Sequence, residues 1–159
     1  MRRRYFEVLG LLVLVAVAAW WLGRVHPPVS LHYDPGGARL TFNGVKPGDS
    51  LADLEKRWGP PDFKNPQASF QQWERPLTQM HYNKQGLVVD VEGSGTGLLR
   101  QGEVELLRCG DPEERVEAVF GAPATHRDNF YRYPFGLVIH CGSESQGKRW
   151  VSHIQLELR

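Results

Sequence analysis

The sequence has only two cysteines, and neither acidic nor basic residues predominate. Its 159 residues include 19 lysines and arginines against 18 aspartates and glutamates, so the formal net charge is +1. This balance predicts no nucleic-acid partner, because nucleic-acid-binding domains carry a basic excess. Two cysteines are too few for a disulfide scaffold, and Cys109 and Cys141 lack the paired spacing of a zinc site. The remaining composition is that of an ordinary globular protein.

The sequence also lacks the short motifs that mark common enzymes. It contains no Gly-x-Ser-x-Gly, no HExxH, no phosphate loop and no dinucleotide-binding glycines. The glycine-rich stretch 93–97 precedes a predicted strand, so it has no helix N-terminus to bind phosphate. His140 and Cys141 are neighbours on a predicted strand and point to opposite faces, which disfavours a shared metal ion. We therefore expect no catalytic residue, no metal and no cofactor, and a small hydrolase is the least favoured alternative.

The first 23 residues differ from the rest of the chain. Three arginines at positions 2–4 precede an apolar run from Val8 to Leu22, which ends with two tryptophans. Counted from Tyr5, the segment lies near the lower limit of roughly 17–25 residues for a membrane span, and tryptophans suit the membrane–water interface. Residues 1–23 are thus predicted to be a signal-anchor, or transmembrane, segment. The alternative is a cleaved signal peptide, because the stretch 16–18 satisfies the small-x-small rule.

The arginines also predict the orientation of the chain. Positive residues stay on the cytoplasmic side, so everything after residue 23 is expected outside the cytoplasm. The expected location is the inner (cytoplasmic) membrane, with a single pass and the C-terminal domain in the periplasm. Residues 24–37 contain three prolines and two glycines without a helical period, and are predicted to be a linker.

Two segments of the remaining chain have closely similar sequences. Gly48–Pro61 reads GDSLADLEKRWGPP and Gly110–Pro123 reads GDPEERVEAVFGAP. A second match, at another offset, places Gly86–Leu107 over Gly136–Glu157. Such internal similarity indicates repeated supersecondary units that share a core. We divide the folded part into a first repeat, 38–100, and a second, 101–159.

Each repeat is predicted to contain one short helix and several strands. Asp49 or Ser50 is expected to cap the first helix and Asp111 the second, and a glycine and a proline end both. The strands that follow are typified by residues 149–158, where alternation predicts one solvated and one buried face. Val151, His153, Gln155 and Glu157 are expected to share one of these faces, and the residues between them the other. The expected fold is α+β: two tandem repeats, each a short helix packed on an antiparallel sheet of three or four strands, after the N-terminal transmembrane helix.

This pattern resembles the repeat of the β-lactamase inhibitor proteins (BLIP) and the small outer-membrane assembly lipoproteins, the SmpA/OmlA or BamE-like family. The matching residues are Gly48–Asp49 with Trp58–Pro61, and Gly110–Asp111 with Phe120–Pro123. The resemblance covers nearly all of residues 38–159. It implies a binding module rather than an enzyme, in which the sheet side grips a protein. The chain lacks the lipid-bearing cysteine of the lipoproteins, and no specific binding residue is transferred.

Two further predictions concern particular side chains. Cys109 and Cys141 are expected to form a disulfide, which is permitted outside the cytoplasm; the alternative is two buried free thiols. Tyrosine, tryptophan and arginine commonly anchor protein interfaces. A protein-binding surface is therefore predicted, and its residues are Trp73, Tyr131, Arg132, Tyr133 and Trp150. The alternative for each aromatic residue is packing between sheet and helix.

Together these features predict a membrane-anchored, extracytoplasmic protein-binding module that is not catalytic. Its expected role is envelope assembly or scaffolding, and its expected partner is a protein of the cell envelope. The alternative function is that of a secreted, inhibitor-like protein that blocks an enzyme with its sheet face.

Overall fold

The structure, a computed structural model, describes residues 33–35, 39–74, 77–143 and 148–158. All of them belong to the second of two units, Leu31–Arg159; the first unit is Met1–Ser30. The segment 1–23, predicted to be an anchor, therefore lies outside the described residues, as does most of the linker 24–37. Within the described ranges, no helix has both the length and the apolar character needed to cross a membrane.

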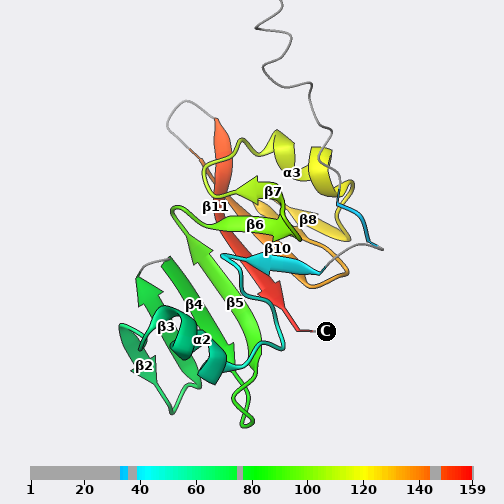
Figure 1. Cartoon of the computed structure of the whole chain (residues 1–159). Helices are drawn as coiled ribbons and strands as arrows, with labels where there is room; N and C mark the ends of the chain where they lie inside the picture. The colour runs from blue at the N-terminus through cyan, green and yellow to red at the C-terminus, as the bar shows by residue number, and fades with distance from the viewer. Residues whose placement is uncertain (1–32, 36–38, 75–76, 144–147, 159) are drawn as a thin grey trace, which may run out of the picture. The chain divides into compact units, whose positions relative to one another are not determined.

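The second unit contains a large antiparallel sheet, a small antiparallel sheet and two short helices (Figure 1). The large sheet has eight strands, which are, in spatial order, β2 (Phe63–Asn65), β3 (Phe70–Glu74), β4 (Leu77–Tyr82), β5 (Val88–Ser94), β11 (Arg149–Glu157), β10 (Leu137–Ser143), β9 (Phe130–Arg132) and β8 (Thr125–Arg127). The small sheet consists of β1 (Leu40–Phe42), β6 (Leu98–Gln101) and β7 (Val104–Arg108). The helices are α2 (Leu51–Trp58) and α3 (Glu114–Phe120).

The predicted fold class is wrong. The described part of the chain is mostly β, and it is not a pair of separate helix-on-sheet units. Strands β2–β5 and β8–β11 join in one sheet through the pairing of β5 with β11, which runs from Ser94 opposite His153 to Asp90 opposite Glu157. This pairing covers two strand edges that separate sheets would leave open to solvent. Residues 98–108 form a hairpin that belongs to the small sheet, which the sequence pattern did not reveal.

The two helices begin in similar ways, but not as predicted. The Asp49 carboxylate accepts the Lys46 amide N–H at 3.1 Å, and the Asp111 carboxylate accepts the Arg108 amide N–H at 2.9 Å. Neither helix has a side-chain cap hydrogen bond. Ser50, one of the two residues predicted for α2, occupies the N-cap position without a capping hydrogen bond, whereas the N-cap position of α3 is Glu113 and not Asp111. Each aspartate instead stabilises the turn before its helix. The Asp49 and Asp111 amides follow glycines with φ of 95° and 98°, a conformation that glycine adopts without strain.

One face of the large sheet packs against the helices and the small sheet. Figure 1 shows α2 and the small sheet on the same side of the large sheet. Leu54 of α2, Phe42 of β1 and Leu107 of β7 are almost fully buried in a single hydrophobic cluster that includes Ile154 of β11. The other face of the large sheet is covered by no described helix or strand.

The glycine-rich stretch 93–97 has a packing role in this core. A Cβ atom on Gly93 would lie 2.5 Å from the Leu77 carbonyl oxygen and 2.9 Å from the Phe42 ring. A Cβ atom on Gly97 would lie 2.3 Å from the same ring. Any side chain at these two positions would displace Phe42, which explains why glycines are clustered there.

Candidate functional site

Three of the five predicted binding residues are buried and do not form an exposed surface. Trp73, Tyr131 and Tyr133 are 2%, 4% and 1% exposed, on the sheet face that packs against the helices. These three side chains are therefore not exposed to a partner in this structure. They pack between the sheet and the helices, which was the alternative prediction for each aromatic residue.

The polar atoms of these three aromatic residues explain their burial. The Trp73 indole N–H donates to the Gly59 carbonyl at 3.2 Å, and the Tyr133 hydroxyl donates to the Gly121 carbonyl at 3.0 Å. Each bond satisfies a carbonyl at the end of a helix, where no intrahelical donor remains. The Tyr131 hydroxyl donates to the Glu113 carboxylate at 2.8 Å. The aromatic residues thus attach the helices to the sheet.

The other two predicted residues, Arg132 and Trp150, lie on the opposite face. Arg132 pairs with Val138 in the strand register, and its guanidinium is 3.0 Å from the Glu157 carboxylate. Trp150 lies opposite Gly142, and its indole ring is 3.1 Å from the position of a Cβ atom on that glycine. Both side chains are partly exposed.

The predicted disulfide is absent, because both cysteines are free and buried in different surroundings. The Cys109 sulfur lies 3.8 Å from the Gly93 carbonyl oxygen, under the small sheet. Cys141 lies on β10 opposite Val151. Burial raises the pKa of each thiol to about 11, so both stay protonated and unreactive at neutral pH.

The uncovered face of the large sheet carries a continuous set of polar and aromatic side chains. Strand register identifies them, because they alternate along each strand with buried residues such as Met80, Val91 and Ile154. We call this surface the open face. Its principal residues are Phe63, Phe70, Gln79, His81, Asp90, Glu92, Phe130, Arg132, His140, Trp150, His153, Gln155 and Glu157.

A histidine–carboxylate pair lies near the centre of the open face. His153 Nε2 is 3.1 Å from a Glu92 carboxylate oxygen, and this hydrogen bond lowers the pKa of Glu92. His140 lies directly opposite His153, with ring centroids 5.8 Å apart, and its other side contacts the Phe130 ring. Burial lowers the pKa of His140, so its imidazole is neutral at neutral pH.

Asp90 is the second carboxylate at the centre of the open face. The Gln155 amide donates to one of its oxygens at 2.5 Å. Its other oxygen is buried and has no hydrogen-bond partner among the described residues. Burial raises the pKa of this carboxyl group, partly offset by the bond from Gln155. Because this oxygen is buried, a donor from a bound molecule reaches it only when the surrounding side chains move.

The chemical groups of the open face are hydrogen-bond donors, acceptors and aromatic rings. Within the described ranges, no three His, Cys, Asp or Glu residues are placed to hold a metal ion. Ser94 lies opposite His153, beside the carboxylate of Glu92, yet no hydrogen bond links this serine to the imidazole in the described structure. A serine nucleophile would need that bond. The arrangement offers donors, acceptors and aromatic edges to a bound molecule.

Comparisons of the chain with protein-family models, with curated proteins and with solved structures find no match. The resemblance to the BLIP and BamE-like repeat therefore stays a prediction from the sequence.

Sequence reasoning missed most of the open face because it followed aromatic residues. A usable signal was present in β11, where the alternation predicts that His153, Gln155 and Glu157 share a solvated face, as they do. Val151 was predicted on that face as well, which is wrong: a bulge between His140 and Cys141 shifts the register and buries it. A bulge of this kind leaves little trace in a single sequence.

Proposed function

We propose that this protein binds another protein through the open face. The observation that carries the proposal is an eight-stranded sheet with one face packed and the other uncovered by the described chain. The uncovered face combines an exposed aromatic residue, Phe63, with a partly exposed tryptophan and an arginine, the residue types that anchor interfaces. A hydrogen-bonded sheet also presents these side chains at fixed spacings, which reduces the entropy lost on binding.

The centre of the open face favours a partner that supplies hydrogen-bond donors. Glu92 is an anion, and its hydrogen bond with His153 uses one carboxylate oxygen and leaves the other for a partner, whereas the unpaired oxygen of Asp90 is buried. Charge-assisted hydrogen bonds from a partner arginine or lysine would be the strong contacts here. Arg132 is already paired with Glu157 and contributes a rim contact.

The cellular setting of this binding is a separate proposal and depends on the N-terminal sequence. Arginines followed by an apolar run favour attachment to the inner membrane, with residues 38–159 outside the cytoplasm. The proposed partner is then a protein of the cell envelope, and the role is assembly or scaffolding. In the alternative setting, a secreted protein would use the same face to block an enzyme.

Site-specific photocrosslinking in cells tests the open face. Phe63 and Val104 are both exposed hydrophobic residues, 53% and 46% exposed, but only Phe63 lies on the open face. Each is replaced by the same photoreactive phenylalanine analogue. A specific protein product is expected from position 63 and not from position 104.

A substitution at the centre of the open face tests whether the partner captured at position 63 also contacts that centre. Asp90→Asn removes the charge and keeps the side-chain shape, so we expect it to reduce the crosslink at position 63. Glu103→Gln, in the turn between β6 and β7, is the matched control. Equal products from positions 63 and 104, or a product unaffected by Asp90→Asn, would contradict the proposal.

A further inference from the structure

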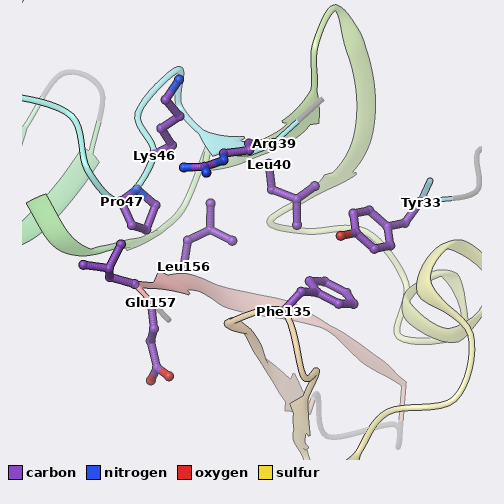
Figure 2. A pocket seen from close by; sticks show the side chains of 9 residues that line it. Tyr33, Arg39, Leu40, Lys46, Pro47, Phe135, Leu156 and Glu157 are labelled. Atoms are coloured by element: carbon purple, nitrogen blue, oxygen red, sulfur yellow. The ribbon is translucent and has the colours of Figure 1, made fainter. Parts of the chain in front are cut away.

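A separate pocket, with a volume of about 230 Å³, opens between β1 and the end of β11 (Figure 2). Its wall includes Tyr33 and Phe135, and its floor includes Leu40 and Leu156. In Figure 2 the side chains of the two leucines point into the same space, and the Tyr33 hydroxyl points toward it. None of these four residues belongs to the open face; Glu157, which belongs to both linings, points away from the pocket in Figure 2.

The apolar part of the pocket is built before any ligand arrives. Leu40 and Leu156 are 8% and 3% exposed and are held by the core. The Tyr33 and Phe135 rings are stacked with centroids 4.3 Å apart, and the Tyr33 amide N–H donates to the Val119 carbonyl at 2.9 Å. The wall is therefore fixed by both backbone and ring contacts, and a ligand need not order it.

The positive charge at the polar part of the pocket comes from Arg39, because the Lys46 amino group points away from the pocket in Figure 2. Arg39 and Lys46 line the pocket, and among the described residues neither side chain has an ion pair. Figure 2 shows the Arg39 side chain extending over Leu156 toward Pro47. The acidic lining residue, Glu157, points away from the pocket in the same view, and its carboxylate is paired with Arg132 at 3.0 Å.

From this geometry we infer that the pocket binds a short aliphatic carboxylate. Its acyl chain lies between the two leucines and the aromatic wall, and its carboxylate meets the Arg39 guanidinium, whose planar donors match a carboxylate. The volume lies below the roughly 300–1,000 Å³ of pockets for drug-sized ligands, which limits the chain to a few carbons. Residues 24–32 of this chain are not the expected occupant of the pocket. They contain no carboxylate to pair with Arg39, and they include an arginine, Arg24, which Arg39 would repel. The inference is independent of the proposed protein binding.

Three ligands of equal chain length test the charge requirement: hexanoate, hexanamide and hexylammonium. Each is titrated into the isotope-labelled full-length protein at constant pH and ionic strength, and amide chemical shifts are followed. With hexanoate we expect saturable shifts at Leu40, Phe135 and Leu156, with a dissociation constant on the order of a millimolar. Hexanamide should bind more weakly, and hexylammonium should leave these resonances unchanged.

Charge reversal tests the assigned residue. Arg39→Glu should weaken hexanoate binding by about fivefold, the upper end of what an exposed ion pair contributes. Lys84→Glu, in the exposed turn between β4 and β5, is the matched control and should leave the affinity unchanged. Resonances outside the pocket report whether each variant is folded.

Several outcomes would overturn the inference. These are equal shifts with hexylammonium, shifts that do not saturate, or an affinity that Arg39→Glu leaves unchanged while the protein stays folded. A short peptide ending in a leucine carboxylate carries the same two groups as hexanoate. Tighter binding of that peptide than of hexanoate would overturn the small-molecule assignment in favour of a polypeptide terminus.

Discussion

Single residues decide how closely the two sheets approach each other. Phe42 of the small sheet occupies the space above Gly93 and Gly97, where a side chain would otherwise be. Phe42 is fully buried, so its ring has no free volume into which it could turn. The glycines that suggest a flexible loop in the sequence are thus part of a close contact in the core.

The first prediction concerns this contact. Gly93→Ala should lower the free energy of unfolding by about 1–3 kcal/mol, because the new methyl group would overlap the Leu77 carbonyl and the Phe42 ring. Chemical denaturation followed by tryptophan fluorescence measures the change. Ser94→Ala, the next residue on the same strand but on the open face, should be close to neutral. Equal free energies of unfolding for the two variants would contradict the prediction, because they would show that the core accommodates the added methyl group without loss of stability.

The second prediction concerns the pH dependence contributed by His140. Burial, followed by the nearby His153, lowers the pKa of His140 below its ordinary value, while Glu92 acts in the opposite direction. The unfolded chain therefore binds more protons than the folded chain in the range just below about pH 6.5. In that range protonation favours unfolding, so this residue makes the protein less stable as the pH falls.

His140→Gln removes this contribution. The loss of unfolding free energy between about pH 7.5 and about pH 5.5 should be smaller in the variant than in the parent protein. Urea denaturation at both pH values gives the comparison. His126→Gln, an exposed histidine on β8, is the control and should retain the parental pH dependence. A variant with the parental slope would mean that His140 does not contribute to it.

At the scale of elements, aromatic side chains connect each short helix to the large sheet. Helices of this length are marginal by themselves, since helix nucleation is costly. Trp73 and Tyr133 each reach across to the glycine carbonyl that follows a helix, and each is almost fully buried beside it. The helices are therefore maintained by tertiary contacts more than by their intrinsic propensity.

The third prediction follows from this arrangement. Tyr133→Phe retains the ring and leaves the Gly121 carbonyl without its donor, so it should lower the free energy of unfolding by about 1 kcal/mol. Tyr133→Ala should cost about 3–5 kcal/mol, because it also leaves a cavity. Both values are measurable by chemical denaturation. A Tyr133→Phe protein as stable as the parent would show that the hydrogen bond is replaced, for instance by solvent.

At the scale of the whole molecule, the N-terminal segment remains a prediction from sequence. Retention of residues 1–23 predicts a protein of full-length mass that sediments with membranes and resists extraction by high salt. Cleavage after the small residues at 16–18 predicts a shorter, soluble protein. Intact-mass measurement of the protein isolated from cells distinguishes the two. A shortened mass would contradict the anchored form and favour the inhibitor-like alternative.

The sequence alone was sufficient for those local features that depend on neighbouring residues. The two helices occur where Gly-Asp and Gly-x-Pro bracket an apolar stripe, because turn and termination signals act within a few residues. The strands at residues 70–74 and 77–82 and the part of β11 at residues 153–157 likewise follow their alternation. Local conformational preference and side-chain periodicity are properties of the chain itself.

Only the tertiary structure decided which strands pair and which faces are buried. The joining of β5 to β11, the bulge that buries Val151 and the burial of Trp73, Tyr131 and Tyr133 depend on residues distant in sequence. The alternation of residues along a strand does not show whether an aromatic side chain lies on the buried face or on the exposed face. The choice is made by whichever face the helices and the small sheet cover, since that is where apolar surface leaves water.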